Sequence, residues 1–144
     1  MKKSLIILIG LCIFHATFAQ HPKHEFRATW LTSGMRIDWP KSNNIEQQKE
    51  SLCKIFDVMS KGNMNAACLQ VRSFSDALYK SSYEPWSEYL TGTRGQDPGY
   101  DPLQFAIDEA HKRGMELHVW VNPFRASTGS LSSSDVMWSN AGDW

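Results

Sequence analysis

Four polar residues stand at the ends of two apolar runs of this sequence. Gln70 and Arg72 close the first run, and Asn122 and Arg125 follow the second. Arginine offers a fork of donors that can hold sugar hydroxyls, a substrate carboxylate or ionised catalytic acids. The Asn122 amide can donate to a hydroxyl or stabilise developing charge. These residue types favour a binding site for a polar ligand, although the two arginines also fit structural ion pairs.

A carboxylate and several aromatic rings add to this set. Asp76 lies shortly after Arg72 and is a candidate for ligand binding, with a loop cap or an ion pair to Arg72 as the structural alternative. Trp86, in a long polar stretch, and Trp120 combine apolar area with a polar edge, which suits stacking on a pyranose ring. Trp30 lies inside an apolar run and is expected to pack in the core.

The pattern of apolar residues predicts three strands. Short runs rich in aromatic and β-branched residues indicate strands at 25–33, 65–72 and 116–121. The stretch 73–100 follows neither the strand nor the helix period and is longer than an ordinary connection. We therefore expect it to be functional or to pack as an excursion from the sheet.

Two amphipathic helices are predicted between the strands. The first begins near Asn44, carries apolar residues at helical spacing and is expected to end with Gly62 in a left-handed conformation. The second has Asp101 as its cap and Pro102 as its first residue, and it ends at Gly114.

Strands that alternate with helices through short turns predict an α/β fold with a parallel sheet. In such sheets ligands bind at the carboxyl ends of the strands. We therefore expect one rim to carry the polar and aromatic candidates, namely Gln70, Arg72, Trp120, Asn122 and Arg125.

Alternation along the third strand separates its two faces. Leu117, Val119 and Val121 share the face that is expected to pack under the helices, whereas His118, Trp120 and Asn122 share the other. If the sheet closes into a barrel, the second face lines the lumen. A polar and aromatic lumen favours sugar binding.

The amino-terminal residues are typical of an export signal. Residues 1–19 contain Lys2 and Lys3, then an apolar run, and then a cleavage site that ends at the small residue Ala19. This pattern predicts a signal peptide followed by a mature segment at 20–144. The apolar run is too short for a stable membrane span, so no integral membrane segment is expected after cleavage. Export would place the product in the periplasm, at the cell surface or outside the cell.

The composition argues against several classes of partner and cofactor. The chain has 15 Lys and Arg against 15 Asp and Glu, which provides no basic stripe for nucleic acid. His21, His24 and His111 form no metal-binding pattern, and no glycine-rich phosphate loop is present, so no metal or other cofactor is expected. Cys53 and Cys68 are expected to be small buried residues, with a disulfide between them as the alternative.

Three segments together resemble a known family. FRATWLTS with IDWP, QVRSFSDALYKSSYEPWSEYLTG, and DPGYDPLQFAIDEAHKRGMELHVWVNPFRA are similar to the amino-terminal part of the glycosyl-hydrolase-like 10 family, over residues 25–126. The resemblance implies an exported glycoside hydrolase with a (β/α)8 TIM-type barrel. It also implies a polysaccharide or other glycan substrate, with peptidoglycan glycan strands of the cell wall as one substrate class.

The sequence is shorter than the barrel that the resemblance implies. A barrel of this type needs about 250 residues, whereas residues 20–144 supply about three strands and two helices. The resemblance places the acidic cluster at the end of the fourth strand, beyond Trp144, so the catalytic residues stay unassigned. We expect a fragment truncated at its carboxyl end and inactive alone. A non-catalytic glycan-binding surface protein and an inactive gene remnant are the alternatives.

Overall fold

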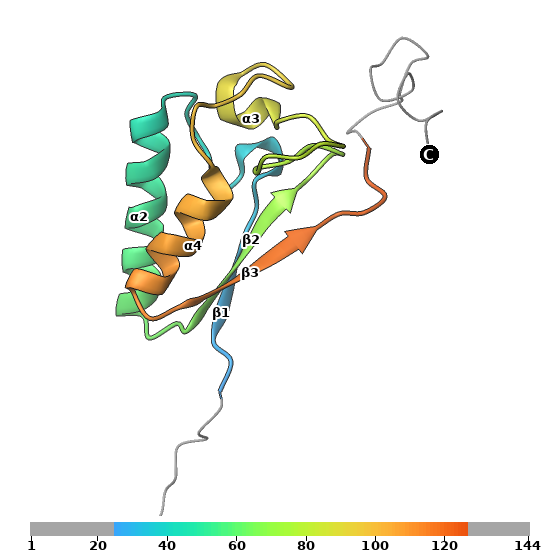
Figure 1. Ribbon diagram of the computed structural model, residues 1–144. Coiled ribbons are helices and arrows are strands. Elements are labelled where there is room, and N and C mark those ends of the chain that lie inside the picture. The colour runs from blue at the N-terminus through green and yellow to red at the C-terminus, as the bar shows by residue number, and fades with distance from the viewer. Residues whose placement is uncertain (1–24, 127–144) are drawn as a thin grey trace, which may run out of the picture.

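A computed structural model describes residues 25–126 as a three-stranded parallel sheet with helices on one face (Figure 1). The sheet order is β1 (Ala28–Leu31), β2 (Ala66–Arg72) and β3 (Glu116–Val121), and each strand runs parallel to its neighbour. The predicted α/β class with a parallel sheet is confirmed. This arrangement is compatible with the first units of a barrel. The expected signal peptide at 1–19 lies outside the described residues.

Two long helices, α2 (Ile45–Lys61) and α4 (Pro102–Lys112), form a layer against the sheet (Figure 1). Both begin as predicted, because the side chains of Asn44 and Asp101 accept backbone N–H groups of the first helical turn. These caps satisfy donors that have no partner within the helix. Local sequence therefore determines where each helix starts.

The end of α2 differs from the prediction. Gly62 caps the helix with a φ of −79°, and Asn63 is the residue in the left-handed region, with a φ of 61°. Asparagine tolerates this region because its short polar side chain can hydrogen-bond to the nearby backbone. The helix α4 ends just before Gly114, as predicted, and Gly114 adopts the left-handed conformation with a φ of 69°.

The core lies between the sheet and the helix layer. The central strand β2 is buried from Ala66 to Val71, because it is paired on both edges. Leu52 and Phe56 of α2 are fully buried against it, and Ala106 of α4 packs into the same cluster. This cluster fixes the strands whose carboxyl ends carry the candidate residues.

The long stretch between β2 and α4 packs as an excursion from the sheet. This was one of the two expectations for residues 73–100. Its Leu78 and Leu90 side chains are 1% exposed and belong to the main core. The stretch also contains a short helix, α3 (Glu88–Thr91), that lies against the 3-10 turn η1 (Gly34–Arg36) after β1. Neither short element was predicted. In Figure 1, α3 stands beyond the carboxyl ends of the strands.

β3 is less covered than expected. Leu117 packs against the core, but Val119 and Val121 are 54% and 42% exposed. The prediction that all three pack under helices is therefore wrong for two of them within the described residues. α4 contacts β3 but leaves the carboxyl half of that strand uncovered.

Both cysteines are free thiols, with Cys68 buried and Cys53 half-buried. The alternative prediction of a disulfide between Cys53 and Cys68 is therefore wrong for this structure. Within residues 25–126, no helix combines the length and the apolar character that crossing a membrane would require.

Candidate functional site

The sheet face opposite the helices carries two aromatic pairs. Trp30 of β1 and Trp120 of β3 meet edge to face with ring centroids 5.1 Å apart, and Phe26 meets His118 in the same way at 5.2 Å. Trp30 was expected to pack in the core, but 61% of its surface is exposed. Trp30 is exposed because it lies in register with Cys68, on the sheet face that the helices do not cover.

Asn122 holds one of these rings. The Trp120 indole N–H donates to Asn122 Oδ1 at 2.9 Å, and Asn122 Nδ2 donates to the Ser73 carbonyl at 3.4 Å. The backbone N–H of Asn122 also donates to the Arg72 carbonyl at 3.0 Å. Asn122 therefore extends the pairing of β2 and β3 beyond the strand end and orients the Trp120 ring.

Arg72 forms a structural ion pair, as its alternative interpretation proposed. Its Nε donates to Glu84 Oε1 at 2.5 Å, Nη1 donates to the Asn122 carbonyl, and Nη2 lies 3.3 Å from Ser75 Oγ. The partner is Glu84 of the excursion, and the ion pair between Arg72 and Asp76 is not formed. Arg72 thus links three segments at the carboxyl edge of the sheet.

Asp76 acts as a loop cap. The residue is 2% exposed, and its Oδ1 accepts backbone N–H groups from Ser73 at 3.1 Å and Phe74 at 2.8 Å. These bonds satisfy the buried carboxylate and fix the turn that follows β2. Its predicted role in ligand binding stays a prediction.

Gln70 joins the carboxyl ends of β1 and β2. Its Oε1 accepts the backbone N–H groups of Ser33 at 3.0 Å and Gly34 at 2.9 Å, and the residue is 2% exposed. Because two N–H donors point at Oε1, the orientation of the amide is determined and Nε2 is its remaining donor. Gln70 is in register with Trp120, so both lie on the helix-free face.

Phe74 connects the remaining parts of this edge. The Arg125 guanidinium lies 4.7 Å from the centre of the Phe74 ring, which is a cation–π distance. The Tyr89 ring of α3 lies 6.2 Å from the same ring. Arg94 donates to the carbonyls of Phe74 and Ser75 at 3.2 and 2.6 Å. Arg125 itself is exposed, so its outer surface can meet a ligand.

Trp86 occupies a different setting from the one predicted. It is half-buried and packs against the main core from the excursion. Its backbone carbonyl accepts the N–H of Gly95 at 2.8 Å. Stacking of Trp86 on a sugar stays a prediction, whereas Trp30 exposes more of its ring.

The structure gathers Gln70, Arg72, Asp76 and Asn122 around Ser73. Besides the bonds above, the hydroxyls of Ser33 and Ser73 lie 2.6 Å apart in a buried position. Sequence reasoning missed several members of this cluster, namely Ser33, Ser73, Phe74, Glu84 and Arg94. Their contacts join separate loops, and no local periodicity marks them.

Three acidic groups near this edge, Asp38, Asp76 and Glu84, are engaged in structural contacts. Asp76 caps its turn, Glu84 pairs with Arg72, and Asp38 Oδ2 accepts the backbone N–H of Thr32 at 2.8 Å. Within residues 25–126, no group of three or more His, Cys, Asp or Glu side chains could hold a metal ion. The edge of the sheet therefore offers aromatic surface and donors for binding.

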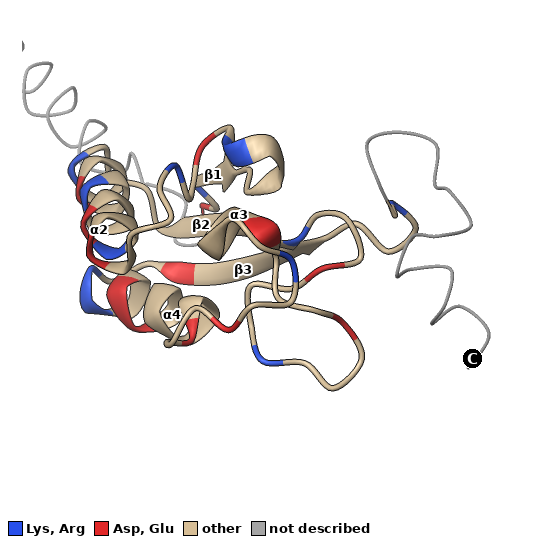
Figure 2. Ribbon diagram, turned by 90° about the horizontal axis from the view of Figure 1, so that it is seen from above, with Lys and Arg blue, Asp and Glu red and all other residues tan. Residues whose placement is uncertain are grey.

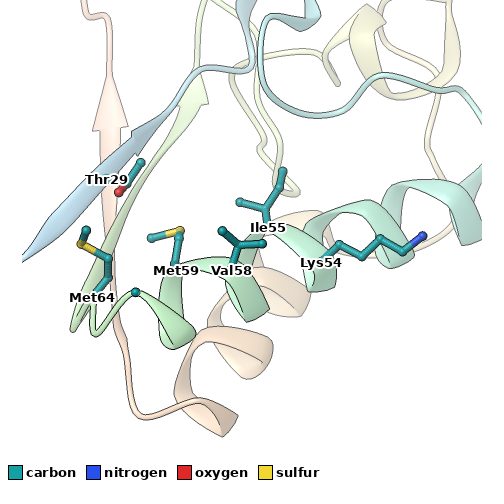
Figure 3. Close-up of a pocket in the computed structure, with 7 residues that line it drawn as sticks. Thr29, Lys54, Ile55, Val58, Met59 and Met64 are labelled. Carbon is teal, nitrogen blue, oxygen red and sulfur yellow. The ribbon is translucent and has the colours of Figure 1, made fainter.

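A separate groove of about 550 Å³ lies on the other side of the sheet, between β1 and α2 (Figure 3). Its lining comes from Thr29, Lys54, Ile55, Val58, Met59, Gly62 and Met64. This groove is apolar and contains none of the predicted site residues. The helices α2 and α4 carry charged residues of both signs (Figure 2).

Comparison with known proteins places this sequence in a family. The chain is 45% identical to glycosyl hydrolase YngK of Bacillus subtilis over 123 residues, which cover 83% of this chain and 24% of YngK. It is 39% identical to glycosyl hydrolase DigH of Escherichia coli over 120 residues, which cover 77% of this chain and 27% of DigH. The chain thus spans about a quarter of the length of these relatives. Residues 25–140 match the family glycosyl hydrolase-like 10, and the chain belongs to that family.

Proposed function

We propose that this sequence forms the amino-terminal part of the catalytic barrel of an exported glycoside hydrolase. The proposed substrate is a polysaccharide, with peptidoglycan glycan strands as the preferred class. Family membership supports the reaction type. The parallel sheet with one helix-covered face supports a barrel whose lumen is the opposite face.

The observation that carries the proposal is the Trp30–Trp120 pair on the helix-free face. An indole ring provides apolar area for a pyranose face. The Trp120 ring is held in one orientation by Asn122, and the Gln70 amide lies in the same register. The exposed Trp30 ring can therefore stack on the apolar face of a sugar, beside a Trp120 ring that Asn122 fixes.

In this proposal the described residues bind the glycan and the catalytic acids come from another part of the protein. Glycoside hydrolysis usually requires a pair of carboxyl groups that flank the scissile bond. The carboxylates of Asp38, Asp76 and Glu84 at this edge already bind backbone N–H groups or Arg72. We therefore assign no catalytic role to Asp76 or Glu84.

The test uses the native exported protein that carries this sequence. Its intact mass is compared with the 16.4 kDa of the chain, and release of soluble products from purified peptidoglycan glycan strands is measured. We expect a larger mass, cleavage of the strands, and weaker binding by about tenfold in Trp30→Ala than in Trp30→Phe. A product of the short chain's mass that neither binds nor cleaves glycan would contradict the proposal.

A non-catalytic glycan-binding protein is the second candidate. The observation in its favour is that Asp76 and Glu84 at this edge are engaged while the Trp30 ring is exposed. Binding of glycan strands that leaves their length unchanged would favour this candidate. Export through cleavage after residue 19 belongs to both proposals, and the amino-terminal sequence of the secreted product tests it.

A further inference from the structure

The turn after β1 contains two consecutive residues in the left-handed region. Met35 has a φ of 55° and Arg36 a φ of 56°, and neither is glycine. L-residues with long side chains avoid this region because Cβ approaches the backbone too closely. Such a conformation persists only where surrounding contacts determine it, and it is frequent at binding and catalytic sites.

Several contacts fix this turn. Gln70 Oε1 accepts the N–H groups of Ser33 and Gly34 immediately before it. The Arg36 backbone N–H donates to the Ser33 carbonyl at 3.0 Å, and the Arg36 guanidinium donates to Asn43 Oδ1. The turn is therefore fixed by a buried contact to Gln70 and by an exposed contact to Asn43. Its geometry is imposed by its neighbours.

The turn exposes one side chain that makes no such structural contribution. Met35 is 56% exposed. It follows Gly34, which packs so closely on the next loop that an added Cβ would meet the Phe74 ring at 3.2 Å. Since the Phe74 ring also contacts Arg125, the turn that exposes Met35 lies at the edge that carries the candidate site. Methionine is apolar and flexible, which suits contact with the irregular apolar face of a sugar.

We infer that Met35 is a ligand-contacting residue of the glycan site and that Gln70 is the positioning residue that holds its turn. This inference rests on the proposed function and deepens it, since it adds a wall on the β1 side of the site. Met35 meets the apolar face of a sugar ring, and Gln70 acts through the backbone of Ser33 and Gly34.

The first experiment separates conformation from contact at Met35. Met35→Asn keeps a residue that accepts the left-handed region and removes the apolar side chain, and Met35→Leu keeps the apolar surface. Binding of soluble peptidoglycan glycan strands and thermal unfolding are measured in the native protein. We expect Met35→Asn to unfold at the same or a higher temperature and to bind about tenfold more weakly. Met35→Leu should bind within about threefold of the unsubstituted protein.

The second experiment concerns Gln70. Gln70→Glu keeps an oxygen that accepts both N–H groups and removes the amide donor, whereas Gln70→Met removes the acceptor. A positioning role predicts that glycan binding is lost in Gln70→Met and largely retained in Gln70→Glu at pH 8. Equal loss in both variants would overturn the positioning role, because it would indicate direct donation by Nε2.

The outcomes distinguish this inference from the proposed function. If the unsubstituted protein binds glycan and Met35→Asn binds equally well, only the inference is overturned. If the unsubstituted protein binds no glycan, the proposed function is overturned together with the inference that rests on it. Binding that falls in Met35→Asn without loss of thermal stability supports both.

Discussion

Arg72 Nε donates to Glu84 Oε1 at 2.5 Å, and both side chains are largely withdrawn from solvent, at 14% and 15% exposure. The same guanidinium donates to the Asn122 carbonyl at the end of β3. One ion pair thus connects the central strand, the excursion and the segment that orients Trp120. Its removal should affect both stability and the site.

We expect Arg72→Met to lower the free energy of unfolding by about 1–3 kcal/mol, because Glu84 would remain withdrawn from water without its partner. Glu84→Gln should cost less, since the neutral amide can still accept from the guanidinium. Urea unfolding of the native protein measures both changes. The double variant Arg72→Met with Glu84→Leu is the control, and it should recover part of the loss. Equal stability of Arg72→Met and the unsubstituted protein would show that the pair contributes nothing.

Asp76 offers a test that separates a cap from a charged ligand contact. Asp76→Asn keeps an oxygen that accepts from Ser73 and Phe74, whereas Asp76→Ala leaves two buried N–H groups without a partner. We expect Asp76→Ala to lose about 1–3 kcal/mol of stability and Asp76→Asn to lose less. Glycan binding should follow the same order. Loss of binding in Asp76→Asn at unchanged stability would instead assign the carboxylate to the ligand.

Glu109 gives the fold a dependence on acid pH. Hydrogen bonds from Lys112 and then Arg113 lower the pKa of the Glu109 carboxyl to about 2, from an ordinary value of 4.5. Because the folded state favours the ionised form, this stabilisation is complete above about pH 4.5 and is lost as the pH falls toward 2. We expect stability measured by urea unfolding to fall across this window, and Glu109→Gln to flatten the fall.

Asp108→Asn is the matched control for this experiment. It removes the neighbouring acid of α4, whose described contact is a hydrogen bond from Gln104 at 2.9 Å. The slope between pH 4.5 and pH 2 should persist in this variant. If the slope instead disappears in Asp108→Asn and persists in Glu109→Gln, the pH dependence belongs to Asp108 and the prediction for Glu109 is wrong.

Cys53 should react slowly as a nucleophile. Burial, followed by the hydrogen bond to Glu109, raises the pKa of the Cys53 thiol, and the thiolate is the reactive form. We expect iodoacetamide to modify Cys53 slowly at pH 8 and faster in Glu109→Gln. Peptide mass mapping measures the rates. Recovery of a peptide in which Cys53 is disulfide-bonded to Cys68 would contradict the free thiols of the structure.

The sequence by itself determined the features that depend on neighbouring residues. The side chains of Asn44 and Asp101 reach N–H groups within one helical turn, so their caps were readable from spacing alone. The order of apolar periods was enough to predict a parallel sheet with candidate residues at one edge. The helix caps and the order of strands and helices can be predicted without knowing what packs on each face of the sheet.

Only the tertiary structure decided the partners across loops and the coverage of each face. Trp30 and Val119 both belong to strands, but their exposure depends on where α2 and α4 lie, which alternation does not specify. Arg72 was free to pair with Asp76 nearby, yet the packed excursion brings Glu84 to it. The two N–H groups that Gln70 binds become close to it only when β1 pairs with β2. Hydrogen bonds and ion pairs act over a few ångströms, so chain folding selects their partners.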